Sequence, residues 1–327
     1  MIFSLYQLNT WLFDGRTMDN YLGTIIDQVL IFATMLSVGF ISYKSGLIDD
    51  KTVDGTGRVV TRILLPFLIF SAITGAGSMS VVAAQLPFFL CILLAQAGQI
   101  AIGRLTGRLM GLKGDTLNVH SVTMGFSNNG FIGYPLLLAL FPDGGALAVA
   151  VYSLADGVLA WTVVPYMLDT DENKKIEPKR LLTPVTIAML LGFLLLILKA
   201  GTENIVMQTI KNAGATSKYF ALLYIGADIA RKSLAVLKKR PVIFASVFIK
   251  LIVMPLVVYS VFSLLPFLTD LQVRMMAVIA MTPSLLAVSV LANEYGSDSE
   301  YASLTVLMTS IACLFTMPLI IWIISSL

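Results

Sequence analysis

Hydrophobic positions gather in long runs separated by short polar segments, and two of these runs are interrupted near their centres. The first, Val119–Phe141, reads VHSVTMGFSNNGFIGYPLLLALF, and the second, Met275–Tyr295, reads MMAVIAMTPSLLAVSVLANEY. Each is long enough to cross a bilayer, because about 20 helical residues span roughly 30 Å of hydrocarbon. Helix-breaking or polar residues stand in the middle of both runs: Asn128, Asn129, Gly130, Gly133 and Pro135 in the first, and Thr282, Pro283 and Ser284 in the second.

Such interruptions free backbone polar groups at a depth where lipid cannot satisfy them. Proline lacks an N–H donor and clashes with the preceding turn, and glycine weakens a helix. Irregular backbone at this depth survives only against protein or a water-filled cavity, and a matched pair of interrupted spans predicts the binding site of a transporter. A simple proline kink is the alternative. It accounts for the second run alone better than for the pair, because the Asn-Asn-Gly cluster also places amides where burial is costly.

A window of about 19 residues gives ten expected spans, at residues 21–42, 59–75, 81–103, 119–141, 146–168, 183–198, 213–230, 242–265, 275–295 and 302–324. The seventh is the weakest, since Lys218 and Asp228 bracket a short apolar run. The most hydrophilic segment, Asp169–Arg180, divides the spans into two sets of five. We therefore expect an interfacial segment at 1–20, a first five-helix repeat at 21–168, a hinge loop at 169–182 and a second repeat at 183–327.

Composition supports a membrane protein over a soluble domain. Of 327 residues, 57% are hydrophobic and 13% are charged, whereas about 25% of the residues in soluble domains are charged. The net charge of +3 does not indicate nucleic acid as a partner, because the distribution of Lys and Arg matters more than their sum in membrane proteins. Cys91 and Cys313 both lie in apolar spans, so neither a metal site nor a disulfide is expected.

Basic residues predict the orientation. One set of loops and span ends is rich in them and is expected to face the cytoplasm: Lys44, Lys51, Arg58, Arg62, Arg104, Arg108, Lys113, Lys174, Lys175, Lys179, Arg180, Arg231, Lys232, Lys238, Lys239 and Arg240. The other set holds Arg16, Lys199, Lys211, Lys218 and Arg274. Both termini are then outside, and the second half enters the membrane in the opposite sense to the first, because five is odd. Each half has its interrupted helix fourth.

Several runs together resemble the auxin efflux carrier family, which includes bacterial organic-anion permeases and plant auxin exporters. They are VGFISYKSGLID, RILLPFLIFSAIT, NNGFIGYPLL, YFALLYIGADIA and SVLANEYGSD, and the match covers nearly the whole chain from Tyr21 onward. Asn128 stands seven residues before Pro135, as the family's fourth-helix asparagine stands before its crossover proline, and Pro283 falls at the ninth-helix crossover.

The resemblance implies an all-helical fold with ten transmembrane helices, built as two inverted five-helix repeats in which the broken helices 4 and 9 cross. It also implies a scaffold and a transporter domain that move relative to each other, with an anionic substrate beside the crossing helices. The chain lacks the long central loop of the plant carriers. This favours a prokaryotic permease and argues against auxin itself as the substrate.

The interruptions supply groups that suit a carboxylate. A helix cut at mid-membrane presents unpaired N–H groups and partial positive charge, which attract anions. Asn128 and Asn129 add amide donors, and Thr282 and Ser284 add hydroxyls. The alternative is that these side chains only satisfy the exposed backbone carbonyls of the broken helices.

Among the 19 carboxylates, Asp27, Asp156 and Asp228 are the aspartates within an expected span that invite a functional interpretation. A mid-membrane carboxylate costs roughly 2.5–3.5 kcal/mol on insertion scales. Asp156, at the middle of the fifth span, is the candidate for coupling as a proton carrier or sodium ligand, or else a structural acceptor held by the neighbouring broken helix. Asp27 is expected to reach water. Asp228 precedes Arg231 and Lys232, which predicts a capping or interfacial ion pair.

Two further ionisable residues invite a functional interpretation. Lys250 lies more than two turns inside the eighth span, but its long stem is expected to let the ammonium snorkel to water rather than bind substrate. His120 is the single histidine and opens the fourth span. Its titration range suits a proton relay, yet a lone histidine at an interface is expected to be solvated.

The sequence thus predicts a transporter of small organic anions in the plasma membrane, the inner membrane of a bacterium, with the bilayer as its other partner and a homodimer left open. No cofactor is expected beyond a coupling Na⁺ or H⁺. A sodium- or proton-coupled bile-acid-type symporter or antiporter is the alternative transporter, and a signalling module is the alternative of another class. An enzyme is not expected, because one histidine and two isolated cysteines offer no catalytic constellation. A GxxxxGK[ST] nucleotide loop is missing too.

Overall fold

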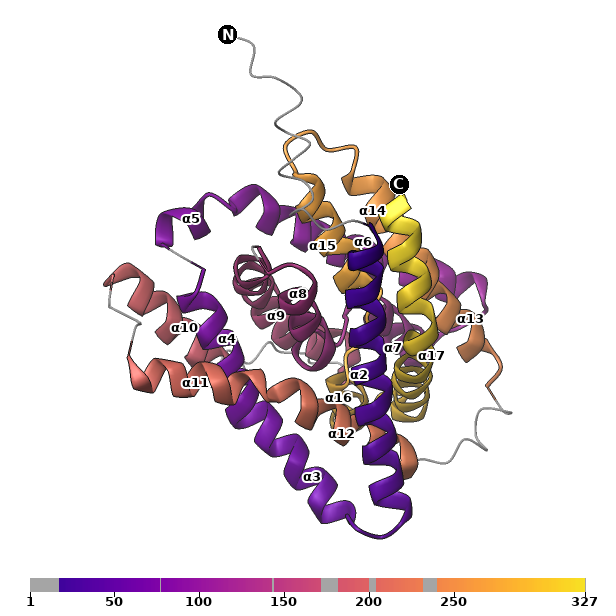
Figure 1. Cartoon of the computed structure of the whole chain (residues 1–327). Helices are drawn as coiled ribbons and strands as arrows, with labels where there is room; N and C mark the ends of the chain where they lie inside the picture. Colours follow the sequence, from indigo (N-terminus) through magenta and orange to yellow (C-terminus); the bar gives the residue numbers. More distant parts are fainter. Residues whose placement is uncertain are drawn as a thin grey trace.

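The computed structural model describes residues 18–76, 78–142, 144–171, 182–199, 204–231 and 240–326. Helices are the only extended regular elements within these ranges (Figure 1). Most of the expected interfacial segment, residues 1–17, and most of the expected hinge loop, residues 172–181, lie outside the described residues.

The helices occur in each of the ten expected stretches, with some boundaries displaced. In chain order they are α2 (Met18–Lys44), α3 (Asp50–Val59), η1 (Val60–Leu64), α4 (Leu65–Thr74), α5 (Met79–Ala83), α6 (Leu86–Leu109), α7 (Gly114–Gly125), η2 (Asn129–Gly133), α8 (Tyr134–Leu140), α9 (Gly145–Leu168), α10 (Pro184–Ile197), α11 (Ile205–Ala215), α12 (Ser217–Arg231), α13 (Val242–Phe248), η5 (Ile249–Val253), α14 (Met254–Phe262), α15 (Asp270–Ala280), α16 (Ala287–Glu294) and α17 (Ser299–Ser326).

Three boundary predictions are wrong. Helix begins at Asp50, well before the second expected span at 59–75, because α3 continues through η1 into α4. The expected loop after the third span is largely helix, because α6 continues to Leu109 and carries Arg104 and Arg108 on its last turns. The seventh stretch is two helices, α11 and α12, which are separated at Thr216. In each place the helix packs against another one, α3 on α12, α6 on α7 and α11 on α4, and tertiary packing of this kind stabilises helices outside an apolar run.

Five of the described helical segments are long and apolar enough to cross a membrane: Asp50–Thr74, Leu86–Leu109, Gly145–Leu168, Val242–Phe262 and Ser299–Ile324. The outer face of α6 shows the expected apolar surface. Leu86, Leu90 and Leu94 repeat every four residues and are all more than half exposed. A stripe of this kind suits contact with lipid and would be a liability in water.

Three prolines each follow a widened helical turn. Pro66, Pro135 and Pro255 stand at the second position of α4, α8 and α14, directly after the π-helical segments η1, η2 and η5. The residue after each segment donates its N–H to a carbonyl five residues back, as Leu65 does to Val60. Proline cannot fill the bond to position i−4, and a π turn absorbs the extra space within a continuous helix.

One group of helices contains a close contact that depends on two glycines. α2 packs along α12, and α4 packs against α10 and α11. A Cβ on Gly39 of α2 would collide with the carbonyl oxygen of Leu223 on α12, and a Cβ on Gly226 of α12 would collide with the carbonyl oxygen of Leu36 on α2. The two backbones approach closely only because both positions are glycine, as small-residue packing between membrane helices requires.

The remaining long helices form a second group around the interrupted stretches. α6 packs on α7, α14 on α15, α16 on α17, and α17 also contacts α7 and α13. Figure 1 shows α8 and α9 near the middle of the molecule, with α4, α10 and α11 on one side and α13 and α17 on the other. The largest hydrophobic core includes residues from both groups, among them Phe32, Ile73, Leu137, Leu222 and Met281.

Candidate functional site

The two interrupted stretches meet at their breaks. Asn128 donates its backbone N–H to the carbonyl oxygen of Pro283 at 2.7 Å, and Leu285 donates to Phe126 O at 3.0 Å. These two bonds form an isolated antiparallel bridge between Ser127 and Ser284. Each interrupted stretch thereby supplies hydrogen-bond partners to the non-helical backbone of the other. Irregular backbone away from water requires such partners.

The C-terminal end of α7 is closed by three different donors. A helix end leaves its last carbonyls without helical partners. Here Val122 O accepts from the N–H of Phe126 at 3.0 Å, Thr123 O from the hydroxyl of Ser284 at 2.9 Å, and Met124 O from the ammonium of Lys250 at 3.1 Å. A cation at this end also complements the negative pole of the helix dipole.

Lys250 does not snorkel, so that expectation is wrong. Its side chain is fully buried, and besides Met124 O it donates to Ser127 Oγ at 2.9 Å. The π turn η5 contains Lys250, five residues before Pro255. Helix packing holds the side chain toward the junction, where bonds to a carbonyl and a hydroxyl replace those that water would have provided.

Asp156 of α9 accepts three side-chain hydrogen bonds. Gln96 Nε2 of α6 lies 2.7 Å from Oδ1, Asn129 Nδ2 lies 2.7 Å from Oδ2, and the Tyr134 hydroxyl also donates to Oδ2. Asn129 and Tyr134 belong to the interrupted stretch, as the structural interpretation of this carboxylate anticipated. The ammonium of Lys250 also acts on Asp156 through its charge, although no basic residue is near it in sequence.

The side chain of Asn128 lies at the junction without a hydrogen-bond partner. It is 1% exposed, and neither Nδ2 nor Oδ1 has a hydrogen-bond partner. A buried amide left unpaired costs about 1–3 kcal/mol, and such a group is rare enough in folded proteins to indicate a bound ligand or water. The residue that the sequence singled out therefore has a free donor and a free acceptor.

The hydroxyls of Thr282 and Ser284 are engaged in this conformation. Thr282 donates to Ile279 O at 2.8 Å, and Ser284 donates to Thr123 O while its N–H binds Thr309 Oγ1 at 3.2 Å. Both side chains are fully buried. They close helix ends here, and their expected donation to a substrate would require these bonds to exchange.

The glycines and the proline of the first interruption serve close packing. A Cβ on Gly130 would lie 2.7 Å from Leu65 Cδ2, and one on Gly133 would lie 2.8 Å from both Asn129 Oδ1 and Ile279 Cδ1. Pro135 is buried at the second position of α8. Their side chains offer no polar group to a ligand, so they shape the junction through the backbone.

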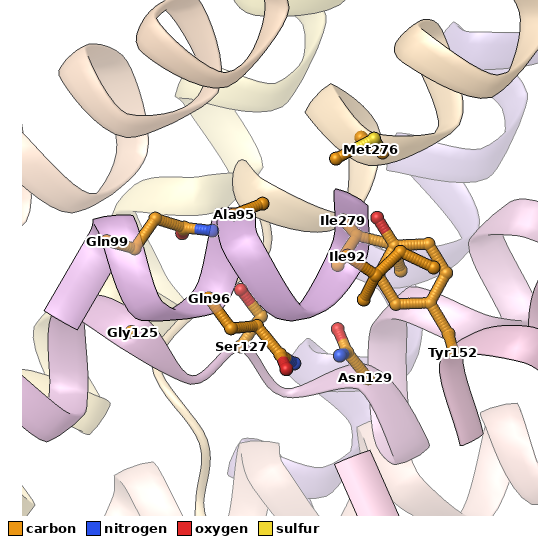
Figure 2. A pocket seen from close by; sticks show the side chains of 10 residues that line it. All are labelled: Ile92, Ala95, Gln96, Gln99, Gly125, Ser127, Asn129, Tyr152, Met276 and Ile279. Atoms are coloured by element: carbon orange, nitrogen blue, oxygen red, sulfur yellow. The ribbon is translucent and has the colours of Figure 1, made fainter. Parts of the chain in front are cut away.

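A small cavity lies beside this junction (Figure 2). Its wall includes Gln96 and Gln99 of α6, Ser127 and Asn129 of the interrupted stretch, and Tyr152 of α9. The cavity has a volume of about 10 Å³, which is room for roughly one water molecule. In this conformation the cavity is therefore too small to hold an organic molecule.

His120 is not solvated, so that expectation is also wrong. It is fully buried, with Nδ1 2.9 Å from the Tyr301 hydroxyl and Nε2 3.2 Å from Thr106 Oγ1. The hydroxyl of Ser246 lies 2.7 Å from that of Tyr301. Thr106, His120, Ser246 and Tyr301 come from α6, α7, α13 and α17, respectively. Their hydrogen bonds therefore link four helices of the second group.

An ionic cluster lies next to these residues, just before α17. Asp298 accepts from Arg240 at 2.6 Å, from the hydroxyl of Thr116 at 2.5 Å and from the backbone N–H of Tyr301 at 3.0 Å. Partial burial opposes the ionised form, but the hydrogen bonds from Thr116, Tyr301 and Arg240 outweigh it and hold the pKa of Asp298 below its usual range.

The other two candidate carboxylates lie where the sequence placed them. Asp27 is exposed on α2. Asp228 forms the expected ion pair with Arg231, at 2.7 Å, and the same guanidinium reaches Asp54 of α3 at 2.8 Å. Neither carboxylate lines the cavity at the junction. Within the described residues, no group of three His, Cys, Asp or Glu side chains is arranged to hold a metal ion.

Sequence reasoning missed Gln96, Gln99 and Tyr134. The two glutamines lie three residues apart in the third apolar run, so they share one face of α6. Primary amides inside a membrane span need partners, and this spacing was a readable signal. Tyr134 gave no comparable signal, because a tyrosine in an apolar run is ordinary, and only its contact with Asp156 marks it.

The described residues form an all-helical arrangement in which several helices are long and apolar enough to cross a membrane, as in a multi-pass membrane protein. The chain matches the family described as membrane transport protein over residues 24–180 and 172–321. It therefore belongs to that family, the auxin efflux carrier family.

Two archaeal relatives are similar along nearly their whole length. An uncharacterized transporter of Methanocaldococcus jannaschii is 24% identical over 312 residues, which cover 91% of this chain and 98% of that protein. Another uncharacterized transporter, from Methanothermobacter thermautotrophicus, is 24% identical over 300 residues, 90% of this chain and 96% of the relative.

Proposed function

We propose that the protein is a secondary transporter or facilitative carrier that moves small organic anions by alternating access, with the substrate bound where the two interrupted stretches meet. The observation that carries this proposal is Asn128, whose side-chain amide is buried and unpartnered beside the backbone bond to Pro283. An amide in this state has a donor to give to a ligand that displaces water.

The electrostatics of the junction favour an anion. The segment η2–α8 begins at Asn129 and α16 begins at Ala287, and a helix N-terminus carries partial positive charge. The buried amine of Lys250 is a further hydrogen-bond donor close by, and its protonated form adds positive charge. A carboxylate suits these groups, because it accepts several hydrogen bonds at once.

We further propose that the ten helical stretches are ten spans arranged as two inverted repeats, residues 21–168 and 183–327, joined by a loop at 169–182. In this arrangement α7–α8 and α15–α16 are equivalent broken helices, which cross where Ser127 and Ser284 pair. The two helix groups would act as a scaffold and a moving domain. The small volume of the cavity supports a cycle in which they separate to admit substrate.

Uptake in proteoliposomes tests the proposed substrate class. Purified protein would be reconstituted with a panel of radiolabelled mono- and dicarboxylates, with neutral amides of the same size as controls. We expect saturable transport of one or more carboxylates and a raised KM for Asn128→Ala at unchanged expression. If folded and inserted protein transports neither the carboxylates nor the amides, the proposal is contradicted.

We also propose that both termini face outward and that the membrane is the plasma membrane of a prokaryotic cell. The segregation of Lys and Arg supports this orientation. Both native cysteines are buried, so a background with Cys91→Ala and Cys313→Ala leaves a single introduced cysteine to report. Asp171→Cys should react with a membrane-impermeant thiol reagent only after cells are opened. Labelling in intact cells would reverse the orientation.

A further inference from the structure

The small cavity beside Asp156 has a chemistry that the proposed anion site does not use. It lies between α6 and the first interruption and is lined in part by three buried amides, Gln96, Gln99 and Asn129 (Figure 2). Its volume of about 10 Å³ admits one water molecule or one small ion and excludes an organic anion.

Asp156 fixes the orientation of two of these amides. An ionised carboxylate only accepts hydrogen bonds, so the atoms at 2.7 Å from its oxygens are the nitrogens of Gln96 and Asn129. Their carbonyl oxygens are thereby directed elsewhere. Gln96 Oε1 and Asn129 Oδ1 are both buried without a hydrogen-bond partner. Figure 2 shows the Gln96 amide pointing from α6 toward Asn129.

A third oxygen completes the set. Gln99 lies one turn beyond Gln96 on α6, is 7% exposed, and leaves Oε1 without a partner. The fully buried unpaired atoms of the cavity amides are thus acceptor oxygens. Such a wall repels a carboxylate and suits a cation, since hard metal ions prefer oxygen ligands and interrupted membrane helices supply sites for coupling cations.

We propose that this cavity binds one monovalent metal cation the size of sodium. Gln96, Gln99 and Asn129 supply the carbonyl oxygens, and Asp156 supplies negative charge through the two amides that it orients. A role for this ion in coupled transport rests on the proposed function. Binding of the ion does not, because it requires no organic anion.

Lys250 limits how strongly the cation is held. Its ammonium lies 2.9 Å from Ser127 Oγ, and Ser127 lines the cavity. A second positive charge in the cavity is therefore opposed by the first. Lys250→Met removes that repulsion and retains most of the apolar stem, so it should tighten cation binding at least about tenfold, a change that corresponds to roughly 1.4 kcal/mol.

Thermal unfolding of the purified full-length protein in detergent tests the site without any transport substrate. Wild type would be compared in sodium, potassium and choline chloride at equal ionic strength. We expect a saturable rise in Tm of about 2 °C or more in sodium. Gln99→Leu should abolish the rise. Gln28→Leu is the matched control, because it removes a glutamine with an unpartnered oxygen on α2, away from the cavity.

Equilibrium binding of ²²Na⁺ to wild type and Lys250→Met supplies a second measurement, which stays informative if Gln99→Leu fails to fold. One bound sodium in wild type, and tighter binding in Lys250→Met, would support the site even if no carboxylate is ever transported. No bound sodium and equal Tm in all three salts would show that water fills the cavity and would overturn the inference, whether or not carboxylates are transported.

Discussion

The backbone N–H of Asn128 donates to the carbonyl oxygen of Pro283 at 2.7 Å, although 155 positions separate the two residues (283 minus 128). This bond joins the two breaks, and the side chains around it are of two kinds. Lys250 and Ser284 close the end of α7, whereas Asn128, Gln96 and Asn129 keep unpartnered atoms. The side chains that close the end of α7 stabilise the junction, whereas those with unpartnered atoms mark where we expect ligands to bind.

Lys250 and Asp156 should be coupled in stability. Lys250→Met leaves Met124 O and Ser127 Oγ without their donor and removes the positive charge near Asp156. We expect a loss of about 2–4 kcal/mol in the free energy of unfolding. Adding Asp156→Asn should recover part of this loss, because the buried negative charge goes too. Unfolding of the single and double variants in a thermodynamic cycle measures the coupling energy, and strictly additive losses would contradict it.

Asp156→Asn tests coupling directly. The asparagine keeps the size of the carboxylate but carries no charge, so neither a proton nor a cation should be coupled to movement of the anion. We expect exchange of substrate to persist and accumulation against a gradient to be lost in proteoliposomes. Accumulation with the wild-type dependence on external pH and sodium would limit Asp156 to a structural role.

Gly226→Ala should destabilise the contact between α2 and α12. Its Cβ would meet the carbonyl oxygen of Leu36, which belongs to helical backbone and cannot move aside cheaply. We expect a loss of about 2 kcal/mol or more, within the range of overpacking. Gly98→Ala on α6 is the control, because a Cβ there meets nothing within 4 Å and alanine favours helix by about 1 kcal/mol. Equal Tm values for the two variants would contradict the predicted clash.

Asp298 should give the fold an acid-sensitive contact. Its pKa is lowered in the folded protein, so its ionised form stabilises the fold fully above the ordinary pKa of an aspartate, about 4. This contribution is lost as pH falls through the lower folded pKa. Asp298→Asn should therefore unfold more easily at pH 7, and its Tm should fall less than that of wild type between pH 5 and pH 3. Parallel Tm curves for the two proteins would contradict this account.

Several features follow from the sequence alone. Long apolar runs determine that the chain is helical and lies in a membrane, because only closed backbone hydrogen bonding is stable in lipid. Asn128 and Pro283, both singled out in the sequence, stand where the helices break, and the pair of breaks indicated that they would meet. The charge pattern of Asp228 and Arg231 predicted their ion pair, because residues three apart share one face of a helix.

Only the tertiary structure decided what the buried polar groups do. Lys250 and His120 were expected to reach water, and both are fully buried because other helices bring partners to them. Those partners, Ser127 for Lys250 and Tyr301 for His120, lie 123 and 181 residues away in sequence. The physical reason is that local pattern determines which backbone bonds form, whereas the environment of a charge depends on groups that only folding brings within a few ångströms.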